Sequence, residues 1–291
     1  MPGNARRSLT ALFLVGALGH VWDGVAIRSA SVDQQVSTVP FRLIGGYLIV
    51  VEGAMGRLGG RTFVIDTGTA RTVIDDSIAS GLGLERTSAE LYAVGERTLT
   101  SAAVLPSIAF GPVEARELPV LIADLEPQAQ RFGLSPDALV GMDLLRDRCI
   151  TIDYAAAALK FACGGRWPRS VSIGEGSGFA IVNVRIDQHP YRLLVDSGSE
   201  GVVLFSEAIP AGATIEPDGE FEARHVSGTV RVKRFAPGVF SAGEYTLTPP
   251  PPVFIMTHGG DRSGFDGLLG PHWLRASEVH LDFIRRTMAW R

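Results

Sequence analysis

The chain has 291 residues, long enough for two ordinary domains, and its 46% hydrophobic and 20% charged residues are typical of a folded globular protein. The formal net charge is −4 and no long basic run occurs, which argues against a nucleic-acid-binding protein. No stretch of about 18 uninterrupted apolar residues is present, so a conventional membrane-spanning helix is not expected.

The first predicted element is a signal peptide. The apolar run LTALFLVGALGHV follows Arg6 and Arg7 and is too short to span a membrane comfortably. Gly24-Val25-Ala26 then supplies a small-x-small cleavage pattern. We therefore predict a signal peptide over 1–26 and an exported protein, periplasmic or secreted. The alternatives are a buried first helix or an uncleaved anchor, which would be the only contact with a membrane.

Short β-strands are predicted along most of the remaining chain. The segments GGYLIVVEGAMGRLGGRTFVIDTG (45–68) and SGFAIVNVRIDQHPYRLLVDSG (177–198) each hold two apolar runs separated by a turn, a pattern typical of hairpins. Helical signals are few: DDSIASGLGL (75–84) predicts a short helix ending at Gly81, and MDLLRD (142–147) predicts another. The sequence thus predicts a mainly β protein.

Cys149 and Cys163 flank ITIDYAAAALKFA, which predicts a strand, a turn and a strand. Both cysteines are equally far from Ala156, so they are expected to face each other across the hairpin. A disulfide there is sterically reasonable, would suit an oxidising compartment, and would stabilise the fold by about 3 kcal/mol. Two buried free thiols are the alternative. No metal site is expected, because two cysteines without nearby histidines cannot supply four ligands.

An internal repeat is the most informative feature of the sequence. The motif FVIDTGTARTVI (63–74) recurs as LLVDSGSEGVVL (193–204), and Asp196 stands 130 positions after Asp66. Downstream, ALVGMDLL (138–145) has its counterpart in GLLGPHWL, and ITIDYAAAALKF has its counterpart in VHLDFIRRTMAW, both at an offset of 129. The chain is therefore expected to be a duplication of a unit of about 130 residues.

The repeat predicts two similar lobes, over 31–163 and 179–291, joined by a linker over 164–178. An approximate two-fold between such lobes would place Asp66 against Asp196. Two carboxylates about 3 Å apart cannot both ionise, so they share a proton. The charged member can then take a proton from a bound water while the protonated member polarises the carbonyl under attack, and no metal or organic cofactor is needed.

At these motifs the chain resembles an aspartic protease of the retropepsin-like and pepsin-like group, in its bacterial, exported, single-chain form. The resemblance rests on VIDTGT with LVGMDLL and on LVDSGS with LLGPHWL, and it covers about residues 38 to 291. It implies two β-barrel lobes related by a pseudo-two-fold axis, with the active site in the cleft between them. Asp66 and Asp196 match the catalytic pair of that family.

The resemblance also implies supporting roles for residues beside the two aspartates. The hydroxyls that brace the motif loops against each other are Thr67 and Ser197, the turn glycines are Gly68 and Gly198, the hydroxyls that bond the carboxylates are Thr69 and Ser199, and the glycines packed behind the loops are Gly141 and Gly270. A flap is expected in 93–102 or 224–233, around Gly95 or Gly228, although neither segment has the tyrosine of pepsin-like flaps.

The predicted function is that of an aspartic endopeptidase, which hydrolyses peptide bonds of a protein or peptide substrate with water activated by Asp66 and Asp196. Since both halves of the site lie in one chain, a monomer is expected, with no nucleic acid or metal partner. The alternative is a catalytically silent peptide-binding or scaffold protein that kept the fold and the cleft.

Overall fold

A computed structural model describes residues 9–10, 36–93, 96–126, 133–174, 178–211, 213, 215–225, 228–256 and 264–291. The predicted signal peptide (1–26) lies outside these residues except for β1 (Leu9–Thr10), which pairs in parallel with β17 (Gly219–His225). In the part of the chain so described, no helix has the length and apolar character needed to cross a membrane.

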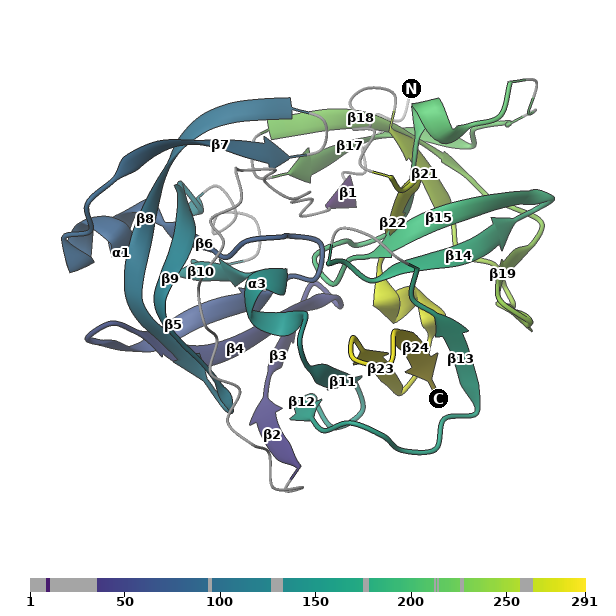
Figure 1. The fold of residues 1–291 in the computed structure, drawn as a ribbon. Coiled ribbons are helices and arrows are strands. Elements are labelled where there is room, and N and C mark those ends of the chain that lie inside the picture. The colour runs from purple at the N-terminus through teal and green to yellow at the C-terminus, as the bar shows by residue number, and fades with distance from the viewer. Residues whose placement is uncertain are drawn as a thin grey trace.

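Three β-sheets make up the molecule, which confirms the prediction of a mainly β fold (Figure 1). The sheet of the N-terminal lobe has the order β3-β4-β5-β10-β6-β9-β8-β7. Its strands are β3 (Arg42–Ile44), β4 (Leu48–Met55), β5 (Leu58–Ile65), β6 (Val73–Asp75), β7 (Thr87–Ala93), β8 (Glu96–Phe110), β9 (Val113–Ala123) and β10 (Ala138–Val140).

Among the described residues of this lobe, the short helices are α1 (Asp76–Leu82) and α3 (Met142–Leu145). The carboxylate of Asp75 accepts a hydrogen bond from the backbone N–H of Ser77 and caps the start of α1. The helix ends at Gly83, which adopts a left-handed conformation, two residues beyond the predicted Gly81. Gly83 stops the helix because it closes the last turn with its own N–H.

The sheet of the C-terminal lobe has the order β1-β17-β18-β21-β16-β22-β15-β14-β19-β20. Its remaining strands are β14 (Ile181–Ile186), β15 (His189–Val195), β16 (Val202–Phe205), β18 (Gly228–Phe235), β19 (Phe240–Ala242), β20 (Tyr245–Thr246), β21 (Val253–Met256) and β22 (Gly267–Leu269). Two 3₁₀ turns follow strands, η1 (Ser206–Ala208) and η2 (Pro271–Leu274). β22 lies parallel to β15 and antiparallel to β16, and β10 makes the same pairings with β5 and β6, so the duplication is present in the topology.

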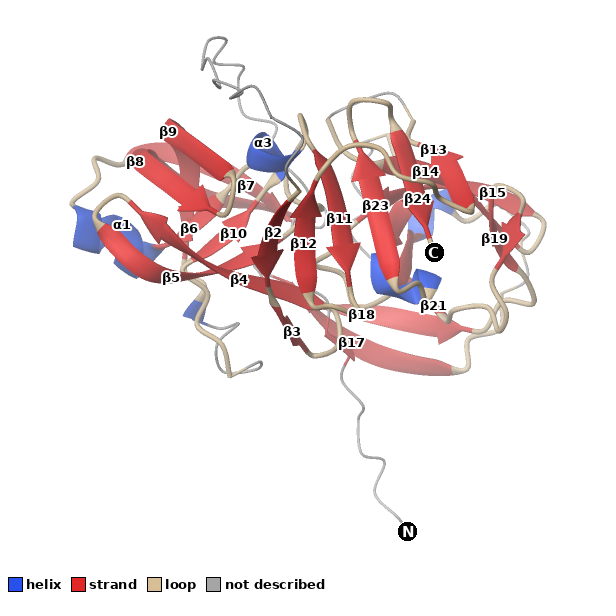
Figure 2. Cartoon of the chain, turned by 90° about the horizontal axis from the view of Figure 1, so that it is seen from below, coloured by secondary structure: helices blue, strands red, loops and turns tan. Residues whose placement is uncertain are grey.

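A six-stranded sheet joins the lobes, and Figure 2 looks onto it. Its order is β13-β24-β23-β11-β12-β2, from β2 (Ser37–Pro40), β11 (Cys149–Asp153), β12 (Ala158–Phe161), β13 (Arg169–Ser172), β23 (Glu278–Asp282) and β24 (Thr287–Trp290). In its central pair, Thr151 lies opposite His280, its own counterpart in the repeat. The pseudo-two-fold axis therefore passes through this point, where Thr151 Oγ1 and His280 Nδ1 are 2.8 Å apart.

This sheet changes the predicted linker (164–178). Arg169–Ser172 forms β13 and pairs with β24. Within this strand Val171 is buried while its neighbours are exposed, so the side chain of Val171 holds the strand against the rest of the protein. β13 is thus the counterpart of β2, one at each edge of the joining sheet. Part of the segment expected to be a linker is therefore a strand.

The predicted disulfide is present, with the Cα atoms of Cys149 and Cys163 5.0 Å apart. The predicted symmetry about Ala156 is off by half a residue, because Ile150 pairs with Phe161 and the turn comprises 154–157. Cys163 therefore lies one residue past the position opposite Cys149, and it can reach back because the paired part of β12 has already ended.

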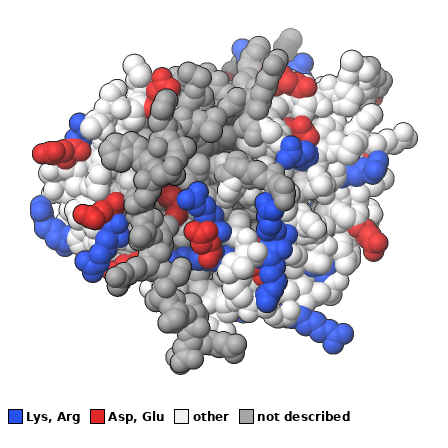
Figure 3. All heavy atoms as spheres, in the orientation of Figure 1, with Lys and Arg blue, Asp and Glu red and all other residues white. Residues whose placement is uncertain are grey.

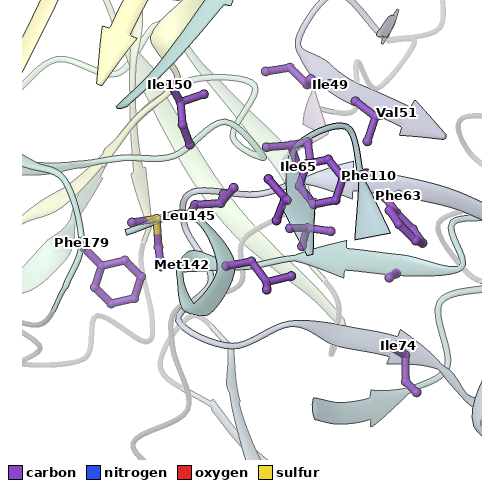
Figure 4. Close-up of a cluster of buried hydrophobic side chains, with 14 of the residues drawn as sticks. Ile49, Val51, Phe63, Ile65, Ile74, Phe110, Met142, Leu145, Ile150 and Phe179 are labelled. Carbon is purple, nitrogen blue, oxygen red and sulfur yellow. The ribbon is translucent and has the colours of Figure 1, made fainter. Parts of the chain in front are cut away.

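A single large apolar cluster runs from the N-terminal lobe into the C-terminal lobe. Phe179 precedes β14 of the C-terminal lobe, yet Figure 4 shows it beside Met142 of α3. In the reverse direction, the ring of Tyr47 lies 5.9 Å from the ring of His272 in η2. Each lobe thus places an aromatic ring against the segment behind the other lobe's motif loop.

Candidate active site

The two motif aspartates lie at equivalent places, directly after β5 and β15. The backbone N–H of Asp66 donates to the carbonyl of Val140 at 3.0 Å, and that of Asp196 donates to the carbonyl of Leu269 at 2.9 Å. These bonds tie each aspartate to the last residue of the neighbouring strand, β10 or β22. Both side chains are buried.

The next residue in each motif reaches across to the other lobe. Thr67 Oγ1 donates to the carbonyl of Val195 at 2.7 Å, and Ser197 Oγ donates to the carbonyl of Ile65 at 2.8 Å. Each hydroxyl also accepts the backbone N–H of the other residue, at 2.9 and 3.0 Å. Four hydrogen bonds between buried groups therefore hold the two loops together, in the arrangement implied by the resemblance for Thr67 and Ser197.

The turn glycines hold the carboxyl groups. Gly68 N–H donates to Asp66 Oδ1 at 2.9 Å, and Gly198 N–H donates to Asp196 Oδ1 at 2.8 Å. A Cβ atom at Gly68 would lie 2.5 Å from Oδ1 of Asp196, closer than real Cβ atoms approach other atoms. The carboxyl of one lobe thus packs directly on the motif backbone of the other, which requires glycine at this position.

The two carboxyl groups also interact with each other. Burial raises the pKa of both Asp66 and Asp196, and the charge of Asp66 raises the pKa of Asp196 further. A hydrogen bond between the two side chains lowers the pKa of Asp66 and raises that of Asp196, so the pair binds a proton that separate exposed carboxylates would release.

The hydroxyls of Thr69 and Ser199 were expected to donate to the carboxylates of their own motifs, but they do not. Thr69 Oγ1 donates to the carbonyl of Arg71 at 3.2 Å, and Ser199 Oγ donates to the carbonyl of Gly201 at 3.1 Å. The tight turn brings a carbonyl two residues ahead within reach, and a hydroxyl has one hydrogen to donate. The backbone N–H groups of Thr69 and Ser199 donate to the backbone carbonyls of Asp66 and Asp196, at 3.4 and 3.1 Å.

Oδ2 of Asp66 and Oδ2 of Asp196 are buried and receive no hydrogen bond from the described residues. In each carboxyl group, Oδ1 is held by the motif backbone while Oδ2 is left for another partner. An acid–base pair needs such an arrangement, because one oxygen of each carboxyl must be available to exchange a proton.

The aspartyl protease family model matches residues 54–144 and 182–273, once in each lobe. The chain belongs to the aspartyl protease family. The crystal structure of an aspartic proteinase from Irpex lacteus is similar in fold, with a TM-score of 0.51 and 12% sequence identity over 88% of this chain and 97% of that one. No curated protein sequence matches this chain.

The family's glycines behind the loops, predicted at Gly141 and Gly270, occupy positions that admit no side chain. A Cβ atom at Gly141 would lie 2.7 Å from the carbonyl carbon of Arg71, and one at Gly270 would lie 2.5 Å from the carbonyl oxygen of Ser199. The segments after β10 and β22 therefore touch the backbone of the aspartate loops directly.

Two flap candidates of this aspartyl protease lie at the ends of hairpins, along the top of the view in Figure 1. The segment 93–102 spans the turn between β7 and β8, and 224–233 spans the turn between β17 and β18. Gly95 lies outside the described residues, and Gly228 is the first residue of β18. Both lobes thus carry such a hairpin, and the sequence prediction did not choose between them.

Two further aspartates support the site and were missed in the sequence. Asp137 Oδ2 accepts the backbone N–H of Thr62 at 2.6 Å, and Asp266 Oδ2 accepts that of Arg192 at 2.7 Å. They pin β10 to β5 and β22 to β15, beneath the two motif loops. The signal was available, because both stand 129 positions apart immediately before ALVG and GLLG.

Asp153 and Asp282, which recur 129 positions apart, have structural roles. Each accepts a backbone N–H three residues ahead, from Ala156 at 2.8 Å and from Arg285 at 2.7 Å, and so closes its hairpin turn. Within the described ranges, no three histidine, cysteine, aspartate or glutamate side chains gather in a way that could hold a metal ion.

Proposed function

We propose that this protein is an aspartic endopeptidase whose Asp66 and Asp196 together activate water to hydrolyse peptide bonds in a protein substrate. The observation that carries the proposal is the burial of both carboxyl groups where the two motif loops meet, with the pKa of each raised. A structural role explains such a pair poorly, because placing two carboxyl groups together in a buried site costs stability.

The proposed reaction begins with one proton on the pair. The ionised carboxylate takes a proton from water as the water oxygen attacks the carbonyl carbon, and the protonated carboxyl donates its proton to the carbonyl oxygen. The tetrahedral intermediate then collapses: the first carboxyl protonates the leaving nitrogen as the C–N bond breaks, and the second takes back a hydroxyl proton. The pair ends with one proton, ready for another cycle.

Peptide release from an unstructured protein substrate, followed by mass spectrometry, tests the proposal. We expect D66N and D196N each to lower the rate by about 100-fold or more, because each removes one member of the acid–base pair. D218N is the matched control, since Asp218 is exposed and pairs with Arg234 away from the motif loops. Equal release by wild type and D66N, or none by wild type from pH 3 to 8, would favour the silent binding protein instead.

The broader setting follows from two observations. The Cys149–Cys163 disulfide supports the proposal that the protein is exported to an oxidising compartment. On the face that Figure 3 shows, positive and negative side chains of the described residues are interspersed, so no charged patch there indicates a substrate of one sign. Cell fractionation with N-terminal sequencing of the mature chain tests export, and protein found only in the cytoplasm with residue 1 intact would contradict it.

A further inference from the structure

Asp143 lies on α3, immediately behind the loop of Asp66. Its Oδ2 accepts the backbone N–H of Thr72 at 2.9 Å, and its Oδ1 accepts the hydroxyl of Thr72 at 2.8 Å. The same hydroxyl oxygen accepts the backbone N–H of Gly141 at 3.2 Å. A closed network thus connects α3 to Thr72, the fully buried residue at the end of the Asp66 loop.

The backbone at Asp143 holds the middle of the same loop. Its N–H donates to the carbonyl of Ala70 at 3.1 Å, and the N–H of Met142 donates to the carbonyl of Thr69 at 2.8 Å. The Asp66 loop is therefore hydrogen-bonded at Thr69, Ala70 and Thr72 to the single turn of chain formed by residues 141–143. Only the bonds to Thr72 depend on a side chain, so they are the part of this attachment that the identity of residue 143 decides.

The C-terminal lobe lacks this network. At the positions equivalent to Thr72 and Asp143 it has Val202 and His272, at repeat offsets of 130 and 129. Val202 is fully buried, so the fold accepts an apolar β-branched residue of the same shape at this place. A hydroxyl–carboxylate pair is therefore not required to build this part of a lobe.

The geometry assigns to Asp143, acting through Thr72, the part of a positioning residue that fixes the Asp66 loop against the loop of Asp196. This assignment rests on the proposed peptidase function, because the relative placement of two carboxyl groups matters most where they exchange protons with a substrate. A second consequence is that a fall in pH changes the attachment of the Asp66 loop but not that of the Asp196 loop.

The response to acid follows from the network. Although Asp143 as a whole is half-buried, burial of its carboxyl raises the pKa to about 6, against the hydrogen bonds from Thr72 and Leu144 and the nearby charge of Arg71. A proton cannot enter on Oδ2, which faces an N–H donor, so it enters on Oδ1 and reverses the bond with the Thr72 hydroxyl. Burial lowers the pKa of His272 to about 4, so the equivalent residue of the other lobe stays neutral at the pH where Asp143 titrates.

Two variants separate the steps of this assignment. T72V gives the N-terminal lobe the side chain of Val202, and D143N replaces an oxygen by an amide that can donate to the Thr72 hydroxyl, as the protonated acid does. D147N is the matched control, because Asp147 is an exposed aspartate four residues after Asp143, just beyond the end of α3.

Steady-state kinetics from pH 4 to 8 form the first arm of the test. We expect D143N to lower kcat about tenfold at pH 7 with KM changed less than about twofold, and to remove an ionisation near pH 6 from the profile. T72V is expected to lower kcat less and to move that ionisation to higher pH, because Asp143 loses one of the hydrogen bonds that favour its ionised form. D147N should keep the profile of the wild type.

Backbone amide hydrogen exchange forms the second arm and does not need activity. We expect faster exchange at residues 67–72 in D143N and T72V, unchanged exchange at residues 197–202, and no change in either loop in D147N. If the wild type cleaves nothing, the proposed function fails while this arm still decides the role of Asp143. Wild-type exchange at 67–72 in both variants, or a D143N profile that keeps the ionisation near pH 6, would overturn the assignment.

Discussion

In the N-terminal lobe the backbone N–H of Asp143 donates to the carbonyl of Ala70, whereas in the C-terminal lobe the equivalent carbonyl, that of Glu200, accepts the indole N–H of Trp273 at 2.6 Å. A second difference is Pro271, which stands where the other lobe has Met142 and has no N–H to match the bond from Met142 to the carbonyl of Thr69. The hydrogen bonds where the two aspartate loops face each other (the front of the site) are nearly identical in the two lobes. The bonds that attach each loop to its own lobe (the back) differ. Symmetry is therefore retained where the two aspartates meet and relaxed where each loop is attached to its own lobe.

The front of the site is where a small change is expected to have the largest effect. We expect G68A to lower peptide release at least about 100-fold and to destabilise the fold by about 1–3 kcal/mol, because a methyl group there would overlap the carboxyl of Asp196. Peptide release and urea unfolding measure the two effects. G81A is the control, since a Cβ atom at Gly81 meets nothing within 4 Å. Wild-type activity in G68A would show that the two lobes are not pressed together at this point.

The next largest effect is expected at Thr67 and Ser197, whose hydrogen bonds brace the two loops against each other. We expect T67V and S197A each to destabilise the protein by about 2–3 kcal/mol, because each removes one donated and one accepted hydrogen bond between buried groups. The double variant should cost less than the sum of the two, since each hydroxyl accepts the N–H of the other residue. Urea unfolding of all four proteins gives the coupling, and additive effects would mean that the two hydroxyls act independently.

The smallest effect is expected where the Asp196 loop is attached to the C-terminal lobe by Trp273. We expect W273F to destabilise the protein by about 1 kcal/mol, because the carbonyl of Glu200 loses the indole N–H while the ring packing is largely kept. Amide exchange should then increase at residues 197–202 and stay unchanged at 67–72, the reverse of the pattern for D143N. Increased exchange in both loops would mean that the lobes are not separately fastened.

The front of the site was predictable from the sequence because each half is built within one repeat. Asp66 and Asp196 follow a strand directly, so their placement needed only the strand pattern and the repeat offset. The brace of Thr67 and Ser197 followed from family resemblance, and the structure has the same bonds.

What the sequence did not predict depends on how distant segments meet. The bond of Thr72 with Asp143 joins residues 71 positions apart, and the strand at Arg169–Ser172 exists because β24 offers it an edge. The family resemblance assigned the hydroxyls of Thr69 and Ser199 to the carboxylates. The sequence does not reveal that a backbone carbonyl of the same turn lies within reach of each hydroxyl. Cys163 was placed one position out because the hairpin turn could not be located from a run of alanines.

The pairing of the two aspartates also has a consequence for stability. Because burial raises the pKa of both in the folded state, and the charge of Asp66 raises that of Asp196 further, the folded protein binds more protons than the unfolded chain between the ordinary carboxyl pKa and the raised one. The contribution of the pair to the free energy of unfolding should therefore rise as the pH falls from about 7 toward 5, by an amount on the order of a few kcal/mol. The double variant D66N/D196N should lose most of that slope.

The most direct test of a single site made from two halves is a carboxyl-carbon NMR titration of Asp66 and Asp196 in the wild type and in D66N. In the wild type we expect both carbons to report the same two coupled ionisations, with the second well above the ordinary carboxyl range. In D66N the pKa of Asp196 should fall, because the charge of its partner is gone. Two independent ionisations near pH 4 in the wild type, unaltered at Asp196 by D66N, would contradict a single coupled site.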